Sequence, residues 1–390
     1  MKTESLFCQL LQTPTLFIDL TIAEQDLLLR QLRKEGLLAS FDARLREVDC
    51  LGKLRPKVRD ILAGAYVVAQ EHARMIAWEV NRIVRALHGS DQTILLLKGA
   101  AYGVAGLAMA RGRIVADVDF LVPRDRLDLV EERLTAHGWR TVPLHTYDER
   151  YYREWMHELP PMQHWERLTE IDVHHTILPP TGRFNPDPGL LLESATPLLA
   201  GQGWEYGEWP ELARDYQGPK AMAGAVCGVW LPAPVDMVLH AAAQLFVDSD
   251  FDRGMRDLYD LDQLLRDFGR KDGFWALLVP RALQLDLIRP LYYALRYTHR
   301  LLNTPIPAET LAAARVGAPT WMVGVVMDLL VQRALLPSHP EERERWGAIA
   351  GGLLYIRSHW LRMPPGLLFA HLLRKGRRRF EADVRDRWAF

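Results

Sequence analysis

The spacing of apolar residues divides the chain into a short α/β region between two helical regions. Residues 1–90 repeat apolar side chains at helical spacing, most regularly from Lys57 to Leu87. Residues 91–231 contain short apolar runs and period-two alternation, and helical spacing returns from 232 to 390. The pattern predicts an α+β fold in which a small mixed-sheet core lies between an N-terminal helical layer and a larger C-terminal helical domain.

Inside the core, the pattern predicts a small-residue helix with a strand on either side. The strands are expected at Ile94–Leu97 and Ile114–Val122, and the helix at Ala100–Ala110 after a turn that contains Gly99. Another strand is expected at Leu168–Leu178, where apolar and polar residues alternate.

The remaining core segments are less regular. A helix is expected from Pro123 to about Ala136, followed by a short strand at Trp139–Val142. Leu144–Trp165 combines Tyr, Trp, His, Glu and Arg, and we expect an irregular, solvent-facing segment with weak strand character. Residues from about 179 to 220 are rich in Pro and Gly, which indicates a long excursion with one short helix near Gly189–Leu199.

Two carboxylates share one face of the second predicted strand. Side chains alternate along a strand, so Asp117 and Asp119 point to one side while Val118 and Phe120 point to the other. Repulsion and desolvation make such a pair costly, and a divalent cation would neutralise it. Asp172 has matching polarity on the strand at 168–178, although a solvated strand edge is the alternative interpretation of these residues.

The same stretch resembles a known fold. The order of strand, Gly-containing turn, helix and strand with Asp-x-Asp resembles the nucleotidyltransferases of the DNA polymerase β superfamily. More narrowly, Leu97-Lys98-Gly99, Arg113 and Asp117-Val118-Asp119-Phe120-Leu121-Val122 are similar to a bacterial nucleotidyltransferase family with the pattern LKG, R, DIDLLV. The resemblance covers residues 93–268. One departure is Ala100, which stands where the superfamily usually has Gly or Ser, so Lys98 is expected to replace a hydroxyl contact to phosphate.

The resemblance implies a two-metal nucleotidyl transfer from a nucleoside triphosphate. It assigns Asp117, Asp119 and Asp172 as catalytic residues and as ligands of Mg²⁺ or Mn²⁺. Asp172 is also expected to orient or deprotonate the attacking hydroxyl.

The nucleotide would be bound by residues around the predicted turn. Gly99 would let the backbone approach the phosphates, and Lys98 and Arg113 would neutralise their charge. His174 would touch the acceptor or support the metal ligands. The alternatives are an ordinary turn, surface basic residues and a satisfied polar strand residue. Four later residues are similar to residues on a pair of helices that, in the family, lies opposite the catalytic strands and could hold the nucleotide base and sugar. The preferred interpretation is that they are ordinary polar residues on the surface of helices: His240, Arg256, Asp257 and Asp260.

Composition limits the kinds of acceptor substrate and cellular compartment that we expect. The formal net charge of -1 favours a small-molecule, peptide or protein acceptor over a long nucleic acid. A basic cluster at residues 374–379 leaves transfer RNA open as a substrate. Three widely spaced cysteines argue against a disulfide framework and a zinc site and favour the cytoplasm, and no apolar run reaches the length of a membrane span.

The sequence therefore predicts a nucleotidyltransferase, with two alternatives. One is a non-catalytic or antitoxin-like nucleotide-binding partner protein, which an intact set of carboxylates opposes. The other is an enzyme of the same fold that tailors a peptide natural product.

Overall fold

The computed structural model describes residues 5–143, 146–199, 225–337, 345–366 and 368. Within these residues seven strands form one mixed sheet in the order β3-β4-β5-β2-β1-β7-β6. The strands are β1 (Ile94–Leu96), β2 (Asp117–Leu121), β3 (Trp139–Thr141), β4 (Met162–His164), β5 (Glu170–His174), β6 (Thr196–Leu199) and β7 (Ala225–Leu231). β2 pairs parallel with β5 and antiparallel with β1.

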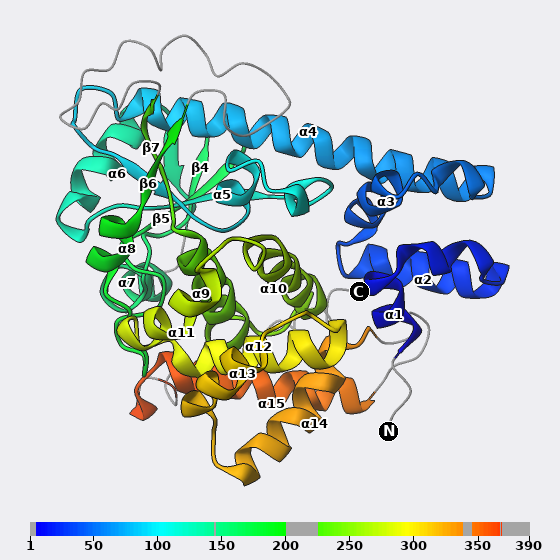
Figure 1. Cartoon of the computed structure of the whole chain (residues 1–390). Helices are drawn as coiled ribbons and strands as arrows, with labels where there is room; N and C mark the ends of the chain where they lie inside the picture. The colour runs from blue at the N-terminus through cyan, green and yellow to red at the C-terminus, as the bar shows by residue number, and fades with distance from the viewer. Residues whose placement is uncertain (1–4, 144–145, 200–224, 338–344, 367, 369–390) are drawn as a thin grey trace, which may run out of the picture.

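Helices precede and follow the sheet, which confirms the predicted α+β class (Figure 1). Before the sheet and within it lie α1 (Leu6–Gln12), α2 (Ile22–Lys34), α3 (Leu38–Glu47), α4 (Pro56–Ala86), α5 (Lys98–Val104), α6 (Leu127–Ala136), α7 (Thr146–Trp155) and α8 (Pro188–Ser194). After it lie α9 (Pro234–Ala243), α10 (Gly254–Phe268), α11 (Phe274–Gln284), α12 (Ile288–Leu302), α13 (Ala308–Ala313), α14 (Trp321–Leu335) and α15 (Arg345–Arg362).

Helix α4 connects the N-terminal helices to the sheet. Pro56 at its first position starts the helix, and Leu62, Ile76, Val80 and Ile83 form its buried stripe. Its contacts with β2, β7, α5 and α6 place it along the sheet, and it also packs on α3. In Figure 1 the helix extends well beyond the sheet towards α1–α3.

The C-terminal helices approach the sheet from the side opposite α4 in the view of Figure 1. α9 begins at Pro234, directly after β7, and packs against α5, α10, α11 and α12. Its buried residues include His240, so a polar side chain of the C-terminal region is enclosed near the start of α5. This arrangement brings residues far apart in the sequence to one place.

The prediction for Leu144–Trp165 is largely wrong. Residues 146–155 form helix α7, and among the described residues the weak strand character is confirmed by the short strand β4. Tyr147, Tyr151 and Trp155 recur every four residues, and their rings contact one another along one face of α7. β4 pairs antiparallel with both β3 and β5, which local composition does not reveal.

Three predicted boundaries also need correction. The helix expected at 100–110 starts at Lys98 and ends at Val104, since Gly106 adopts a φ of +68° that terminates it. The strand expected from Ile114 begins at Asp117. The helix expected near 189–199 is instead the short helix α8 followed by strand β6. Most of the remaining Pro- and Gly-rich segment up to residue 220 lies outside the described residues, and so does the basic cluster at 374–379.

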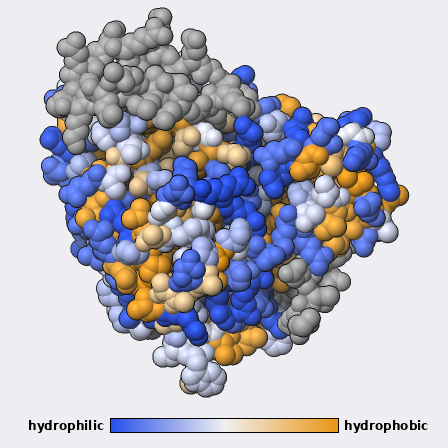
Figure 2. Space-filling model, in the orientation of Figure 1, coloured by the Kyte–Doolittle hydropathy of each residue, from blue (hydrophilic) through white to orange (hydrophobic). Residues whose placement is uncertain are grey.

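The surface carries both polar and apolar residues on the face drawn in Figure 2. On α14 several apolar side chains are exposed, among them Trp321, Met322 and Leu329. Within the described ranges no single helix is long and apolar enough to cross a membrane. The pair Ala308–Gly317 and Trp321–Leu335, bent by 110°, passes that test together on length and composition.

Candidate functional site

Strands β2 and β5 place the predicted carboxylates on one face of the sheet. Their parallel register pairs Asp119 with Asp172, and Asp117 with Glu170. Val118 and Ile171 lie between these positions in sequence and are buried on the other face, as the alternation requires. Asp119 and Asp172 therefore lie side by side, and Asp117 lies two residues before Asp119 on the same face.

Asp119 is the most heavily contacted of these carboxylates. Its Oδ1 accepts a hydrogen bond from Lys98 Nζ at 2.6 Å and is 2.9 Å from His174 Nε2. Burial alone would raise the pKa of Asp119, but the Lys98 cation and His174 outweigh it and hold this pKa well below its ordinary value. Asp119 is thus ionised and binds residues from α5 and β5.

Lys98 reaches the carboxylates from an unusual backbone conformation. Its φ is +46°, in the left-handed region, and it is the first residue of α5. Burial would lower the pKa of Lys98, but Asp119 and Glu158 keep it above its ordinary value, so the amine stays charged. Backbone strain of this kind is common at functional sites and is consistent with a need to aim this side chain.

The neighbouring carboxylates retain protons more strongly. Burial and the charge of Asp119 raise the pKa of Asp117. Burial, Asp119 and Asp117 together raise the pKa of Asp172 to about 7. Ligand atoms of Asp119, Asp172 and His174 all lie within 4.8 Å of one another, and Asp117 is not part of that group. Oxygen ligands with surplus negative charge fit Mg²⁺, since a divalent cation would relieve the repulsion.

The Arg113 side chain packs against the backbone at Gly99. A side chain at Gly99 would collide with the guanidinium of Arg113 and with Val115. Arg113 Nε donates to Asp260 Oδ2 of α10 at 2.8 Å, and its guanidinium lies over the ring of Tyr102. Burial would lower the pKa of Arg113, but Asp260 keeps it above its ordinary value. In this structure Arg113 links the sheet region to α10, and the lack of a Cβ at Gly99 makes room for it.

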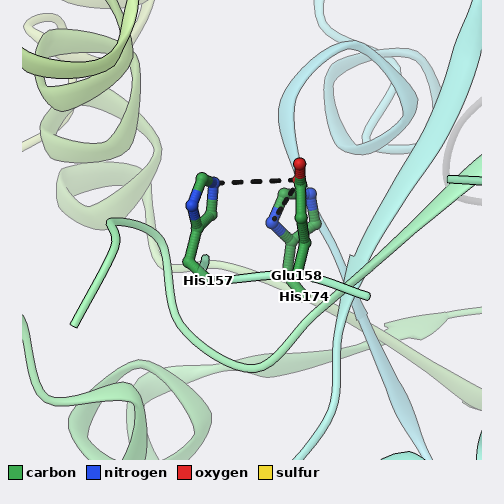
Figure 3. Close-up of side chains that lie close together, drawn as sticks. All are labelled: His157, Glu158 and His174. Carbon is green, nitrogen blue, oxygen red and sulfur yellow. Dashed lines mark ion pairs between the residues drawn. The ribbon is translucent and has the colours of Figure 1, made fainter. Parts of the chain in front are cut away.

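Two residues that the sequence analysis did not select complete the site. Residues 157–159 run antiparallel to β5, because Leu159 N donates to Val173 O and His175 N donates to His157 O, both at 2.9 Å. Glu158 Oε2 consequently lies 3.5 Å from His174 Nδ1 and 3.8 Å from His157 Nε2 (Figure 3). Burial and the charge of Asp172 raise the pKa of Glu158 well above its ordinary value.

The C-terminal helices also contribute. Burial, with the nearby Lys98 cation and His174, lowers the pKa of His240 to about 3, so its imidazole is neutral. Asp260 is bound to Arg113, and Asp257 is bound to Arg256 at 2.9 Å. Asp260 and Asp257 are therefore engaged in ion pairs within the protein, whereas His240 lies near enough to Lys98 and His174 for their charges to lower its pKa.

The comparison with known families identifies the class of the protein. Residues 22–303 match the family described as "Uncharacterised nucleotidyltransferase". This match spans more than half of the chain, and the protein therefore belongs to that nucleotidyltransferase family. The matched range runs from α2 to α12, so helices on both sides of the sheet are part of the family unit. No curated protein and no solved structure matches the chain.

Proposed function

We propose that this protein is a Mg²⁺-dependent nucleotidyltransferase of the two-metal, DNA polymerase β-like type, for which Mn²⁺ can substitute. It transfers a nucleoside monophosphate from a nucleoside triphosphate to a hydroxyl or phosphate of an acceptor. The observation that carries the proposal is the pairing of Asp119 with Asp172 across β2 and β5, with Asp117 on the same face. Family membership supports the nucleotide substrate.

The residues present fit two divalent cations, which when bound would neutralise charge on the triphosphate and on the attacking and leaving oxygens. Asp117, Asp119 and Asp172 would hold them. Asp172 lies beside Asp119 and would also orient the acceptor hydroxyl or accept its proton. The acceptor oxygen then forms a bond to the α-phosphorus, and pyrophosphate leaves with the oxygen that bridged the α and β phosphates.

The triphosphate would bind beside the start of α5. Lys98 is charged and already bound to Asp119, and it would exchange part of that contact for a phosphate oxygen once cations bind the carboxylate. Arg113 is only 12% exposed and bound to Asp260, so we propose that it supports the turn at Gly99 and reaches phosphate only if that ion pair opens. His174 would hold Asp119 in place.

The acceptor is proposed to be a small molecule, a peptide or a protein. A formal net charge of -1 supports this choice, because binding a long nucleic acid requires many phosphate contacts. Steep salt dependence of micromolar binding to transfer RNA would point instead to a polynucleotide acceptor. We also propose a cytoplasmic location and domain limits of 1–90, 91–231 and 232–390.

The test is pyrophosphate release from each labelled nucleoside triphosphate, with Mg²⁺ or Mn²⁺ and extracts or defined acceptors. The matched variant is Asp117→Asn, which removes a half-buried carboxylate and leaves the contact between Lys98 and Asp119. We expect wild-type protein to release pyrophosphate and the variant to lose nearly all of this activity while keeping its circular dichroism spectrum. Equal release by both proteins would contradict the assignment. Binding without release under every condition would favour the non-catalytic alternative.

A further inference from the structure

The three side chains in Figure 3 form a group distinct from the carboxylate set. One oxygen of Glu158 faces one nitrogen of His157 and one nitrogen of His174. We propose that His157, Glu158 and His174 form a separate site for a transition-metal ion such as Zn²⁺, joined to the carboxylate set through His174. The proposal does not depend on the nucleotidyl transfer.

The spacing suits an ion of this size. Ligand atoms about 2.0–2.2 Å from Zn²⁺ in tetrahedral geometry are about 3.4 Å apart. Glu158 Oε2 lies 3.5 Å from His174 Nδ1 and 3.8 Å from His157 Nε2, and all three ligand atoms are within 4.8 Å of one another. The distances from Glu158 Oε2 to the two histidine nitrogens would have to shorten by a few tenths of an ångström at most. The two histidine rings would have to move closer to each other by more than that to reach bonding geometry.

His174 is prepared for coordination by its second nitrogen. Asp119 is paired with the Lys98 cation and is therefore an ionised acceptor, so His174 Nε2 must carry the proton that it donates at 2.9 Å. Nδ1 then presents a lone pair. The His174 side chain is 0% exposed, and within the described residues Nδ1 has no hydrogen-bond partner. A carboxylate that orients a histidine in this way is the usual support of a metal-bound imidazole.

His157 is the second histidine of the proposed site, and the charged groups around it are already paired. This residue is 2% exposed, and its Nε2 is 4.0 Å from Asp248 Oδ2. Asp248 ends a π-helical turn, Gln244–Asp248, and Arg362 holds its other oxygen at 2.8 Å. Such turns occur often at functional sites. The cations near the group, Lys98 and Arg362, are thus already bound to aspartates. Among the described residues the side chains within 4 Å of the Glu158 carboxylate that could pair with it are the two histidines, and no Lys or Arg forms an ion pair with it.

The ligand types separate this site from the Mg²⁺ site. Two imidazoles and one carboxylate favour Zn²⁺, Co²⁺ or Fe²⁺, whereas Mg²⁺ prefers oxygen ligands. Three protein ligands also leave an open position, as in catalytic zinc sites. The cysteine count argued against a zinc site, but this group uses no cysteine. A bound ion would fix the ring of His174 and, through it, the position of Asp119.

The experiment titrates chelator-treated full-length protein with Co²⁺, whose visible absorption reports coordination by nitrogen ligands, and then displaces it with Zn²⁺. Excess Mg²⁺ is present to compete for the carboxylate set, and under that condition we expect one equivalent of Co²⁺ to bind with the absorption of nitrogen ligands. His157→Ala and Glu158→Gln should each weaken binding at least about tenfold. One control, His175→Ala, should bind as wild type, because it removes an adjacent buried histidine whose Nε2 contacts the Met156 carbonyl. Asp117→Asn is compared separately, because it changes the carboxylate set and reports an ion bound there.

Three results would overturn the proposal. One is substoichiometric Co²⁺ binding to wild-type protein. Another is unchanged affinity in Glu158→Gln, which is close to wild type in shape and whose fold is checked by circular dichroism. The third is loss of binding in Asp117→Asn but not in His157→Ala, because the ion would then lie among the carboxylates.

Discussion

Replacing Asp172 with Asn should make the protein more stable at neutral and alkaline pH when no divalent cation is present. The pKa of Asp172 rises from an ordinary 3.8 to about 7, first through burial and then through the charges of Asp119 and Asp117. Between these two values the unfolded chain has lost this proton and the folded protein still holds it. Stability is therefore greatest below about pH 4 and falls as the pH rises through about 7.

The size of the effect follows from that difference. About three pH units at about 1.4 kcal/mol each give a ceiling of about 4 kcal/mol. Asp172 is half-buried, so water screens part of the repulsion, and we expect about 2 kcal/mol. Asn does not titrate, so Asp172→Asn should gain this amount relative to wild type between about pH 4.5 and about pH 8.

The assay is urea unfolding, followed by tryptophan fluorescence, at both pH values with and without Mg²⁺. Glu170→Gln is the matched control, because Glu170 is an exposed carboxylate two residues earlier on β5 and should change stability by less than about 0.5 kcal/mol. Mg²⁺ should stabilise wild-type protein more than Asp172→Asn, since a cation bound to the carboxylates shifts folding by mass action. A wild-type-to-variant difference that is the same at both pH values, or equal stabilisation of both proteins by Mg²⁺, would refute the reasoning.

Three further substitutions test individual contacts. Lys98→Ala should weaken nucleoside triphosphate binding at least about tenfold by calorimetry, and unchanged affinity would remove Lys98 from the site. Asp260→Asn leaves the Arg113 cation buried without its main partner, so the free energy of unfolding should fall by about 3 kcal/mol in urea titrations; a loss below about 1 kcal/mol would contradict that. Gly99→Ala places a methyl group against Arg113 and Val115, and thermal melting should show a loss of about 1–3 kcal/mol, whereas an unchanged melting temperature would show that the turn yields.

Local pattern was sufficient where one face of an element is buried. The alternation around Asp117 and Asp119 correctly predicted which side chains share a face, because a strand repeats every two residues and one face of β2 is covered. The alternation expected within residues 168–178 is found in β5, where the apolar residues Ile171 and Val173 are buried. Helical spacing also predicted the helical regions before and after the sheet. The Lys-Gly turn, the following helix and the Asp-x-Asp strand were also sufficient to indicate the nucleotidyltransferase family.

The partners of these residues depend on the tertiary structure. Arg113 pairs with Asp260, 147 residues later, and no local period indicates such a contact. The prediction for residues 144–165 was wrong for two reasons. The aromatic residues spaced four apart form one face of a helix. The end of the segment pairs with β5 and so becomes a strand. That pairing alone brings His157 and Glu158 to His174. The sequence by itself thus determined the carboxylate face and the class of protein, because these follow from short-range periodicity and a compact motif. Only the tertiary structure decided which charges are paired and where the two histidines and Glu158 meet, because those contacts arise from strand pairing and helix packing across long stretches of chain.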